Sequence, residues 1–213
     1  MSQNKWLVDI DSWVRKDAWQ FFKDYQDPFF NISTRLDVGP LVNYSKSTGQ
    51  KFNLRFLHIL ISSIHEVPEF CMRIEDDKVW QYRTLKCGIT VKHEDGRFSF
   101  TYLPFYSEPH EFVQKSDEHI SLHKQSADLR RHSEEQDKVH VSILPWIHFS
   151  AVKHPRKKFA ENAIPIFTIG KYHRSEEKTW LPFSIEAHHA LVDGWHAAIL
   201  LEKIQEKLFL VEE

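Results

Sequence analysis

The chain has 213 residues, of which 41% are hydrophobic and 27% charged, with a formal net charge of −2. This composition is sufficient for a buried core, and the length favours one large domain over residues 1–213. The near-neutral charge argues against a nucleic-acid-binding protein that relies on phosphate contacts. The densest basic stretch, KHPRKK from Lys153 to Lys158, is interpreted as a solvated loop.

Cysteine usage and the N-terminal residues indicate a reduced, cytoplasmic protein. The two cysteines, Cys71 and Cys87, provide neither a disulfide framework nor the spacing of a metal site. The first residues, MSQNKWLVDID, lack the apolar segment of a secretory signal. No stretch approaches the run of about 18 apolar residues that a membrane-spanning helix needs. We therefore expect no metal and no membrane partner.

The first half of the chain is predicted to mix helices with short strands. Apolar residues at helical spacing predict a helix over Asp11–Tyr25, and alternation predicts a strand over Phe29–Val38. A second amphipathic helix is expected over Asn53–Val67, which ends before Pro68. Short strands are then expected at Cys71–Ile74, Val79–Tyr82, Gly88–Lys92 and Phe98–Leu103.

The second half continues the same mixture. A long polar stretch, Glu108–His132, predicts a surface helix, and WHAAILLEKIQEKL predicts a closing amphipathic helix over Trp195–Leu208. Three strands are expected between them, at Val139–Leu144, Ile164–Tyr172 and Leu181–His189. Helices and strands do not follow a strict βαβ order. The predicted fold class is therefore α+β (mixed α/β), with a large mixed sheet flanked by helices.

The stretch HHALVDGWH, from His188 to His196, carries the clearest functional pattern. Because side chains alternate along a strand, His189 is expected to continue the apolar row of the preceding strand and His188 to lie among polar neighbours. An imidazole in apolar surroundings tends to stay neutral, and a neutral imidazole can act as a general base. A core histidine satisfied by one backbone hydrogen bond is the structural alternative.

Asp193 allows three interpretations. Followed by Gly194, it suits the N-cap of a helix that starts after a strand. A catalytic alternative makes it the partner that orients His189, as in a hydrolase triad. A metal site with the neighbouring histidines is less consistent, because adjacent strand histidines point to opposite faces and cannot both bind one ion without distortion.

The constellation HHxxxDG resembles the active-site motif of the chloramphenicol acetyltransferase family and, more distantly, the shorter motif of dihydrolipoyl acyltransferases. Further segments resemble that family in the same order: Trp13-Val14-Arg15, Lys51-Phe52, Ser142 in SILPW, and Thr168 in PIFTIGKY. The similarity extends from about Ile10 to the last predicted helix.

The resemblance implies the coenzyme A-dependent acyltransferase fold and transfer of an acetyl group from acetyl-coenzyme A to a hydroxyl of a small acceptor, chloramphenicol in the first instance. By this analogy His189 removes the proton of the acceptor hydroxyl, which attacks the thioester directly without an acyl-enzyme. Ser142 donates a hydrogen bond to the oxyanion, and Thr168 helps to position a water beside it. Asp193 pairs with Arg15 and supports the geometry, which replaces the triad interpretation.

The same resemblance implies the binding partners. Lys51 and Lys171 are expected to contact the phosphates of coenzyme A and Tyr172 its adenine, although taken alone such residues are usually ordinary surface and sheet residues. Family members form homotrimers with active sites at subunit interfaces, and acetyl-coenzyme A is the co-substrate. His188 is expected to support the site from the opposite face of the strand.

The acceptor pocket departs from the family pattern. Phe22 stands where the drug-resistance enzymes have a tyrosine, Asp27-Pro28-Phe29-Phe30 replaces a smaller loop, and His140 stands where an asparagine is common. Phe22, Phe30 and His140 are therefore the candidate acceptor residues. Two alternatives stay open: acetylation of a different small alcohol or amine, and a non-catalytic trimeric binding module. A hydrolase is less consistent, because the chain has no GxSxG nucleophile elbow.

Overall fold

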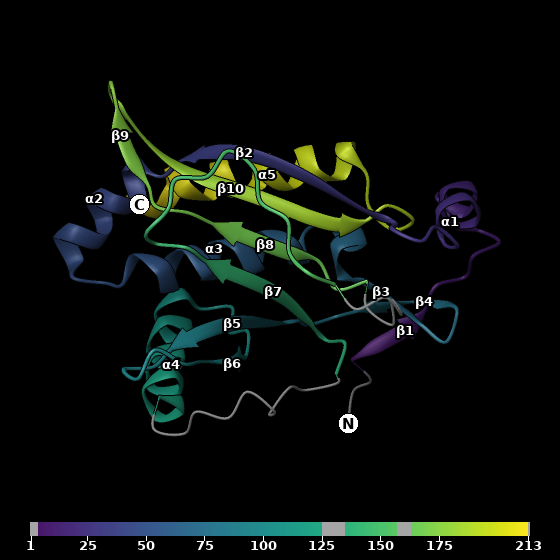
Figure 1. Ribbon diagram of the computed structural model, residues 1–213, viewed down its shortest axis with the longest axis horizontal. Helices are drawn as coiled ribbons and strands as arrows, with labels where there is room; N and C mark the ends of the chain where they lie inside the picture. Colours follow the sequence, from purple (N-terminus) through teal and green to yellow (C-terminus); the bar gives the residue numbers. More distant parts are fainter. Residues whose placement is uncertain (1–3, 125–134, 157–162, 213) are drawn as a thin grey trace.

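A seven-stranded mixed sheet forms the centre of the protein (Figure 1). The computed structural model describes residues 4–124, 135–156 and 163–212. The main path of the sheet runs through β2 (Phe29–Asp37), β10 (Lys178–His188), β8 (Ile166–Ile169), β7 (Lys138–Ile143), β5 (Lys86–Lys92) and β6 (Phe98–Leu103), and β9 (His173–Ser175) pairs with β10. β7 is parallel to β8 and β5, and the other pairs are antiparallel.

Helices flank this sheet, which confirms the predicted fold class. The longer helices are α2 (Gly39–Thr48), α3 (Phe52–His65), α4 (Pro109–His123) and α5 (Gly194–Phe209). Apolar residues of β5, β7, β8 and β10 are buried together with those of α3 and α5 in one core. The short helix α1 (Lys16–Phe22) lies at the end of the molecule where β10 ends, whereas α2 and α4 lie toward the opposite end (Figure 1).

A small second sheet lies beside the first. It has the order β1 (Lys5–Leu7), β4 (Lys78–Tyr82), β3 (Met72–Glu75), and a 3-10 turn, η1 (Pro68–Cys71), leads into it. A second 3-10 turn, η2 (Leu210–Glu212), follows α5. Both cysteines are buried free thiols. No helix in the part of the chain that the structure describes is long and apolar enough to cross a membrane.

Several predicted boundaries are wrong. The helix predicted over Asp11–Tyr25 spans only Lys16–Phe22. It begins late because the Asp9 side chain accepts hydrogen bonds from the Asp11 N–H and the Ser12 hydroxyl and holds a turn there. The expected strand over 164–172 is confined to β8, and the Glu108–His132 helix ends at His123, with residues 125–134 outside the described chain. α2, β1 and β9 were not predicted.

Candidate active site

The face of the sheet turned away from the helices carries a row of hydroxyl side chains. Ser142 on β7 lies in register with Thr168 on β8, which lies in register with Ser184 on β10. Thr168 and Ser184 are each 1% exposed, and Ser142 is partly buried. The alternate positions of these strands carry the apolar core. The sheet therefore places Ser142, the candidate oxyanion donor, beside Thr168, the residue expected to position a water.

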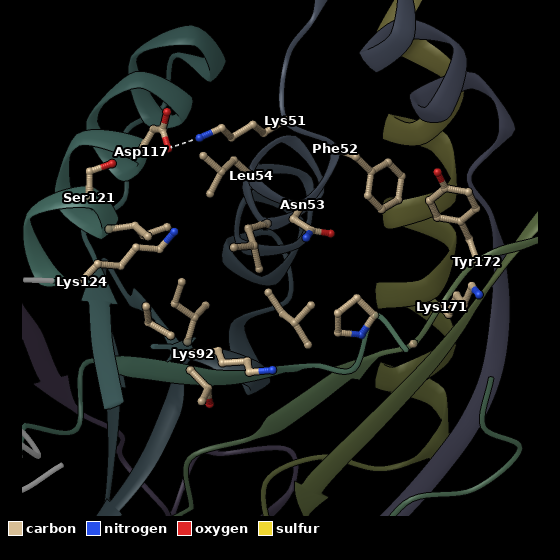
Figure 2. A pocket seen from close by; sticks show the side chains of 18 residues that line it. Lys51, Phe52, Asn53, Leu54, Lys92, Asp117, Ser121, Lys124, Lys171 and Tyr172 are labelled. Carbon is tan, nitrogen blue, oxygen red and sulfur yellow. Dashed lines mark hydrogen bonds and ion pairs between the residues drawn. The ribbon is translucent and has the colours of Figure 1, made fainter. Parts of the chain in front are cut away.

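A pocket of about 750 Å³ opens beside this row, between the start of α3, β5, the ends of β7 and β8, and α4. The three residues expected to bind coenzyme A, Lys51, Lys171 and Tyr172, all line it (Figure 2). Ile143 and Gly170 also line it, and they are close neighbours in sequence of Ser142 and Thr168. The pocket thus reaches the ends of the strands that carry Ser142 and Thr168, although neither hydroxyl lines it.

Three charged residues that were not predicted as site residues also line this pocket, namely two lysines and an aspartate. Lys92 and Lys124 lie across the pocket from Lys171 (Figure 2), and Asp117 of α4 forms an ion pair of 2.5 Å with Lys51. In the sequence these are ordinary polar residues of a strand end and a polar helix. Only the approach of α4 to the start of α3 brings them together.

His189 lies at the other end of β10, one residue beyond the strand. The sequence predicted that His189 belongs to the strand and continues its row of buried apolar side chains. In the structure the residue is only partly buried, and its ring lies between aromatic side chains outside the core. The ring stacks on Phe22 with centroids 4.1 Å apart and an interplanar angle of 4°, and Phe30 lies at 4.9 Å. Its backbone N–H donates to Pro28 O at 2.8 Å. Nδ1 of His189 has no hydrogen-bond partner among the described residues.

His188 is the more deeply buried of the two histidines, at 3% exposure. It was expected among polar neighbours, yet both faces of β10 are covered here, and the edge of its ring meets Phe29 at 5.2 Å. Its Nδ1 accepts a hydrogen bond from the Ala190 N–H. Burial, reinforced by the positive charge of Arg156, lowers the pKa of His188 to about 4, so the ring is neutral near pH 7.

Asp193 combines a cap with an ion pair. Its Oδ1 accepts the backbone N–H groups of Trp195 at 3.0 Å and His196 at 3.4 Å, which caps α5, and its Oδ2 pairs with the Arg15 guanidinium. Burial opposes ionisation, but hydrogen bonds from Arg15 and His196 outweigh it and lower the pKa of Asp193 to about 2. Arg15 also donates to the His189 carbonyl at 3.1 Å. Asp193 therefore acts on His189 through Arg15 and the backbone, not as a triad partner.

The KHPRKK stretch is not a solvated loop over its described part. Arg156 pairs at 2.5 Å with Glu186, a carboxylate of β10 that is 3% exposed and that needs a partner to be charged in this position. His154 hydrogen-bonds Thr168 at 2.8 Å, and Lys153 pairs with Asp27 at 2.9 Å. Residues 157 and 158 lie outside the described chain.

The candidate acceptor residues fall into two groups. Phe22 and Phe30 surround His189, whereas His140 lies two residues before Ser142 on the same face of β7. Gly88 on β5 makes room for it, since a Cβ added there would lie 3.1 Å from Nδ1 of His140. Among the described residues no group of three His, Cys, Asp or Glu side chains is arranged to hold a metal ion.

The histidine and the hydroxyl row are far apart within one chain. Ser184 is in register with Thr168, and His188 lies four residues further along β10. At about 3.3 Å per residue this separates them by about 13 Å along the strand, and Ser142 is offset by a further two strand spacings of about 4.8 Å. One copy of the chain therefore does not bring His189 to Ser142.

Comparison with known proteins identifies the family. A family model described as chloramphenicol acetyltransferase matches residues 3–205. Chloramphenicol acetyltransferase of Proteus mirabilis is 28% identical over 203 residues, which is 94% of this chain and 93% of that protein. Chloramphenicol acetyltransferase 3 of Escherichia coli is 24% identical over 200 residues, which is 93% of this chain and 94% of that protein.

Solved structures agree with the sequence relatives. A chloramphenicol acetyltransferase superposes with a TM-score of 0.90 at 26% identity, covering 96% of this chain and 99% of that one. The cubic core of the pyruvate dehydrogenase multienzyme complex shares the fold, with a TM-score of 0.66 at 16% identity over 91% of this chain and 84% of that one. Because the family model spans nearly the whole sequence, the chain belongs to the chloramphenicol acetyltransferase family of enzymes.

Proposed function

We propose that the protein transfers the acetyl group of acetyl-coenzyme A to a hydroxyl of chloramphenicol, with residues 1–213 acting as one catalytic domain. The observation that carries this proposal is the convergence of Lys51, Lys171 and Tyr172 on one pocket at the ends of the strands that carry Ser142 and Thr168. These residues come from distant segments of the chain. Full-length similarity to named chloramphenicol acetyltransferases supports the acceptor.

The pocket has the chemistry of a coenzyme A site. The phosphates of the coenzyme would lie against Lys51 and Lys171, assisted by Lys92 and Lys124, and Tyr172 offers an aromatic face to the adenine. The thioester would lie toward Ile143 and Gly170, next to the hydroxyl row. Acetyl-coenzyme A acts here as a co-substrate.

The chemistry then needs a base and an oxyanion donor. A bare ring nitrogen of His189 takes the proton of the acceptor hydroxyl while its oxygen attacks the thioester carbonyl. Ser142 donates its O–H to the oxyanion of the tetrahedral intermediate, and Thr168 positions a water beside it. The intermediate collapses by breaking the carbon–sulfur bond, and the coenzyme A thiolate takes the proton from the His189 imidazolium.

A complete site requires His189 from one copy and Ser142 from another, because the two lie too far apart within a chain. Exposed apolar side chains at both ends of the sheet support such a contact: Val14, Phe21 and Trp195 lie near His189, and Trp146 and Ile147 follow β7. Two different patches that meet head to tail form a ring when the rotation between copies closes. We therefore propose a homotrimer with one site at each interface.

A second candidate acceptor is a different small alcohol or amine. His140 and His154 make the Ser142 side of the site more polar than an aromatic antibiotic requires, and Phe22 brings no hydroxyl to the His189 side. A site that lacks a polar contact for a substrate hydroxyl loses much of its selectivity for that substrate. A non-catalytic binding module is less consistent with an intact set of His189, Ser142 and Thr168.

The decisive experiment is release of free thiol from acetyl-coenzyme A by the purified protein, with and without chloramphenicol, and with His189→Ala as the blank. Release that needs both the drug and His189 supports the proposal. Release only with other hydroxyl or amine acceptors moves the substrate and keeps the mechanism. No release with any acceptor contradicts the catalytic function and leaves the binding module.

A further inference from the structure

Thr168 has a hydrogen-bond partner that the sequence did not indicate. Nε2 of His154 lies 2.8 Å from Oγ1 of Thr168, on the polar face of the sheet. Thr168 is itself in register with Ser142, the proposed oxyanion donor. The His154 ring therefore touches the hydroxyl next to the position where negative charge develops in the proposed reaction.

The segment that carries His154 is anchored on both sides of that residue. Lys153 pairs with Asp27 at 2.9 Å, and Arg156 pairs with the buried Glu186 at 2.5 Å. The first partner precedes β2 and the second belongs to β10, so the segment is tied to two neighbouring parts of the sheet. These contacts keep the His154 ring over Thr168 rather than in solvent.

His154 is neutral near pH 7. Its burial is the largest cause that lowers its pKa; the positive charge of Arg156 acts in the same direction and the carboxylate of Glu186 opposes it. A neutral imidazole has one N–H and one bare nitrogen. The hydrogen bond with Thr168 can therefore run in either direction, and the direction decides what Thr168 can offer to a neighbouring group.

We propose that His154 is a positioning residue that donates its Nε2–H to Thr168 and thereby directs the Thr168 O–H toward the oxyanion beside Ser142, directly or through one water. A hydroxyl has a single proton. If Thr168 gave it to His154, only oxygen lone pairs would face the developing negative charge. No proton is transferred between His154 and Thr168 in this arrangement. The proposal rests on the acetyl transfer proposed above.

Kinetics of three variants test the positioning role. His154→Leu removes the donor, and we expect kcat to fall about threefold to tenfold, the worth of one neutral hydrogen bond. The KM for acetyl-coenzyme A should stay unchanged, since His154 does not line the coenzyme pocket. His154→Gln restores an N–H donor and should recover most of kcat. His110→Leu, at an exposed histidine of α4, is the matched control.

A double-mutant cycle separates positioning from general damage. In a Thr168→Val background the hydroxyl is absent, so His154→Leu should cause no further loss of kcat. Equal losses in both backgrounds, a full-rate His154→Leu protein, or no recovery in His154→Gln would each overturn the proposal.

The tautomer gives a readout that does not depend on turnover. In ¹⁵N-histidine NMR spectra at neutral pH, with the signal assigned from its loss in His154→Gln, we expect His154 to carry its proton on Nε2. A proton on Nδ1 overturns the proposal. A wild-type protein that shows the Nε2–H form but transfers no acetyl group contradicts the proposed function, not the direction of this hydrogen bond.

Discussion

The two ends of β10 differ in how complete they are. Away from the end that leads to His189, Lys51, Lys171 and Tyr172 line a pocket that lies within one chain. At the other end, His189 stacks on Phe22 and lies far from the hydroxyl row along the strand. The pocket proposed for coenzyme A thus lies within one copy of the chain, whereas the proposed reaction at His189 needs a second copy.

The difference shows which parts of the function one fold can supply. Binding of a charged coenzyme needs only a cavity with suitable side chains, which a single sheet edge and two helices provide. The proposed reaction needs His189 and Ser142 on either side of reacting atoms that are about 3–3.5 Å apart, and the register of β10, β8 and β7 places these two residues much farther apart within one chain. In the proposed mechanism, association of two copies is therefore needed for catalysis.

Complementation between two inactive variants gives the largest expected effect. His189→Ala should lower kcat about 10²–10⁴-fold as loss of a general base, and Ser142→Ala about 10²–10³-fold as loss of an oxyanion donor. If sites form between copies, unfolding and refolding the two variants as an equal mixture should restore about a quarter of the sites, because random assembly in a closed ring pairs intact His189 with intact Ser142 that often.

The readout is thiol release by the refolded mixture, with each variant refolded alone as the control. A mixture no more active than its components would show that both residues act within one chain, and would contradict the proposed interface site.

Loss of the Arg15–Asp193 ion pair tests how much this pair contributes to the stability of the fold and to the position of His189. Arg15→Gln should lower the free energy of unfolding by about 1–3 kcal/mol, less than for a fully buried pair because the Asp193 side chain is 34% exposed. Activity should fall in the same variant, since Arg15 also holds the His189 carbonyl. Chemical denaturation and thiol release measure the two effects.

The neighbouring exposed pair provides the control for Arg15. Lys16→Gln removes the Lys16–Asp11 pair, which should leave the free energy of unfolding almost unchanged because solvent screens this exposed pair. Lost activity in Arg15→Gln without a change in stability would point instead to a direct chemical role for Asp193.

Much of the fold could be predicted from the sequence where apolar residues repeat strongly. The strand over Phe98–Leu103 is confirmed in both bounds, and α3 differs from its prediction by one residue at the start and two at the end. α2 was missed because only Leu41 and Val42 of its side chains are buried hydrophobic residues, so its periodicity is weak, and Gly39-Pro40 looks like a turn.

The residues of the candidate site also differ in how far the sequence could predict them. The motif with His189 and the coenzyme residues could be selected because a family pattern links them. Asp117, Lys124 and His154 could not, since each becomes a site neighbour only when α4 or the segment after β7 folds over the sheet. The direction in which His189 faces also depends on where β10 ends, one residue earlier than alternation suggested.

Asp117 tests the coenzyme end with a smaller effect. Its carboxylate pairs with Lys51 and competes with the phosphates of the coenzyme, so Asp117→Asn should lower the KM for acetyl-coenzyme A about twofold to fivefold, an effect limited by solvent and reduced by salt. Glu118→Gln, the adjacent exposed acid of α4 that does not line the pocket, is the matched control. An unchanged KM at low salt would show that Asp117 does not compete with the coenzyme for Lys51.

Acid should weaken the fold through two buried histidines, His188 and His65, that do not line the pocket. Burial lowers the pKa of both His188 and His65 to about 4, below the value of about 6.5 expected in the unfolded chain. Between these values the unfolded chain binds more protons, so the free energy of unfolding falls as the pH falls through this window, by up to about 1–3 kcal/mol for each group. Melting temperatures of the wild type and His65→Gln between pH 7 and pH 4 measure the slope. The variant should show a shallower decline, because one buried imidazole no longer resists protonation, whereas parallel curves would show that folding does not lower the pKa of His65.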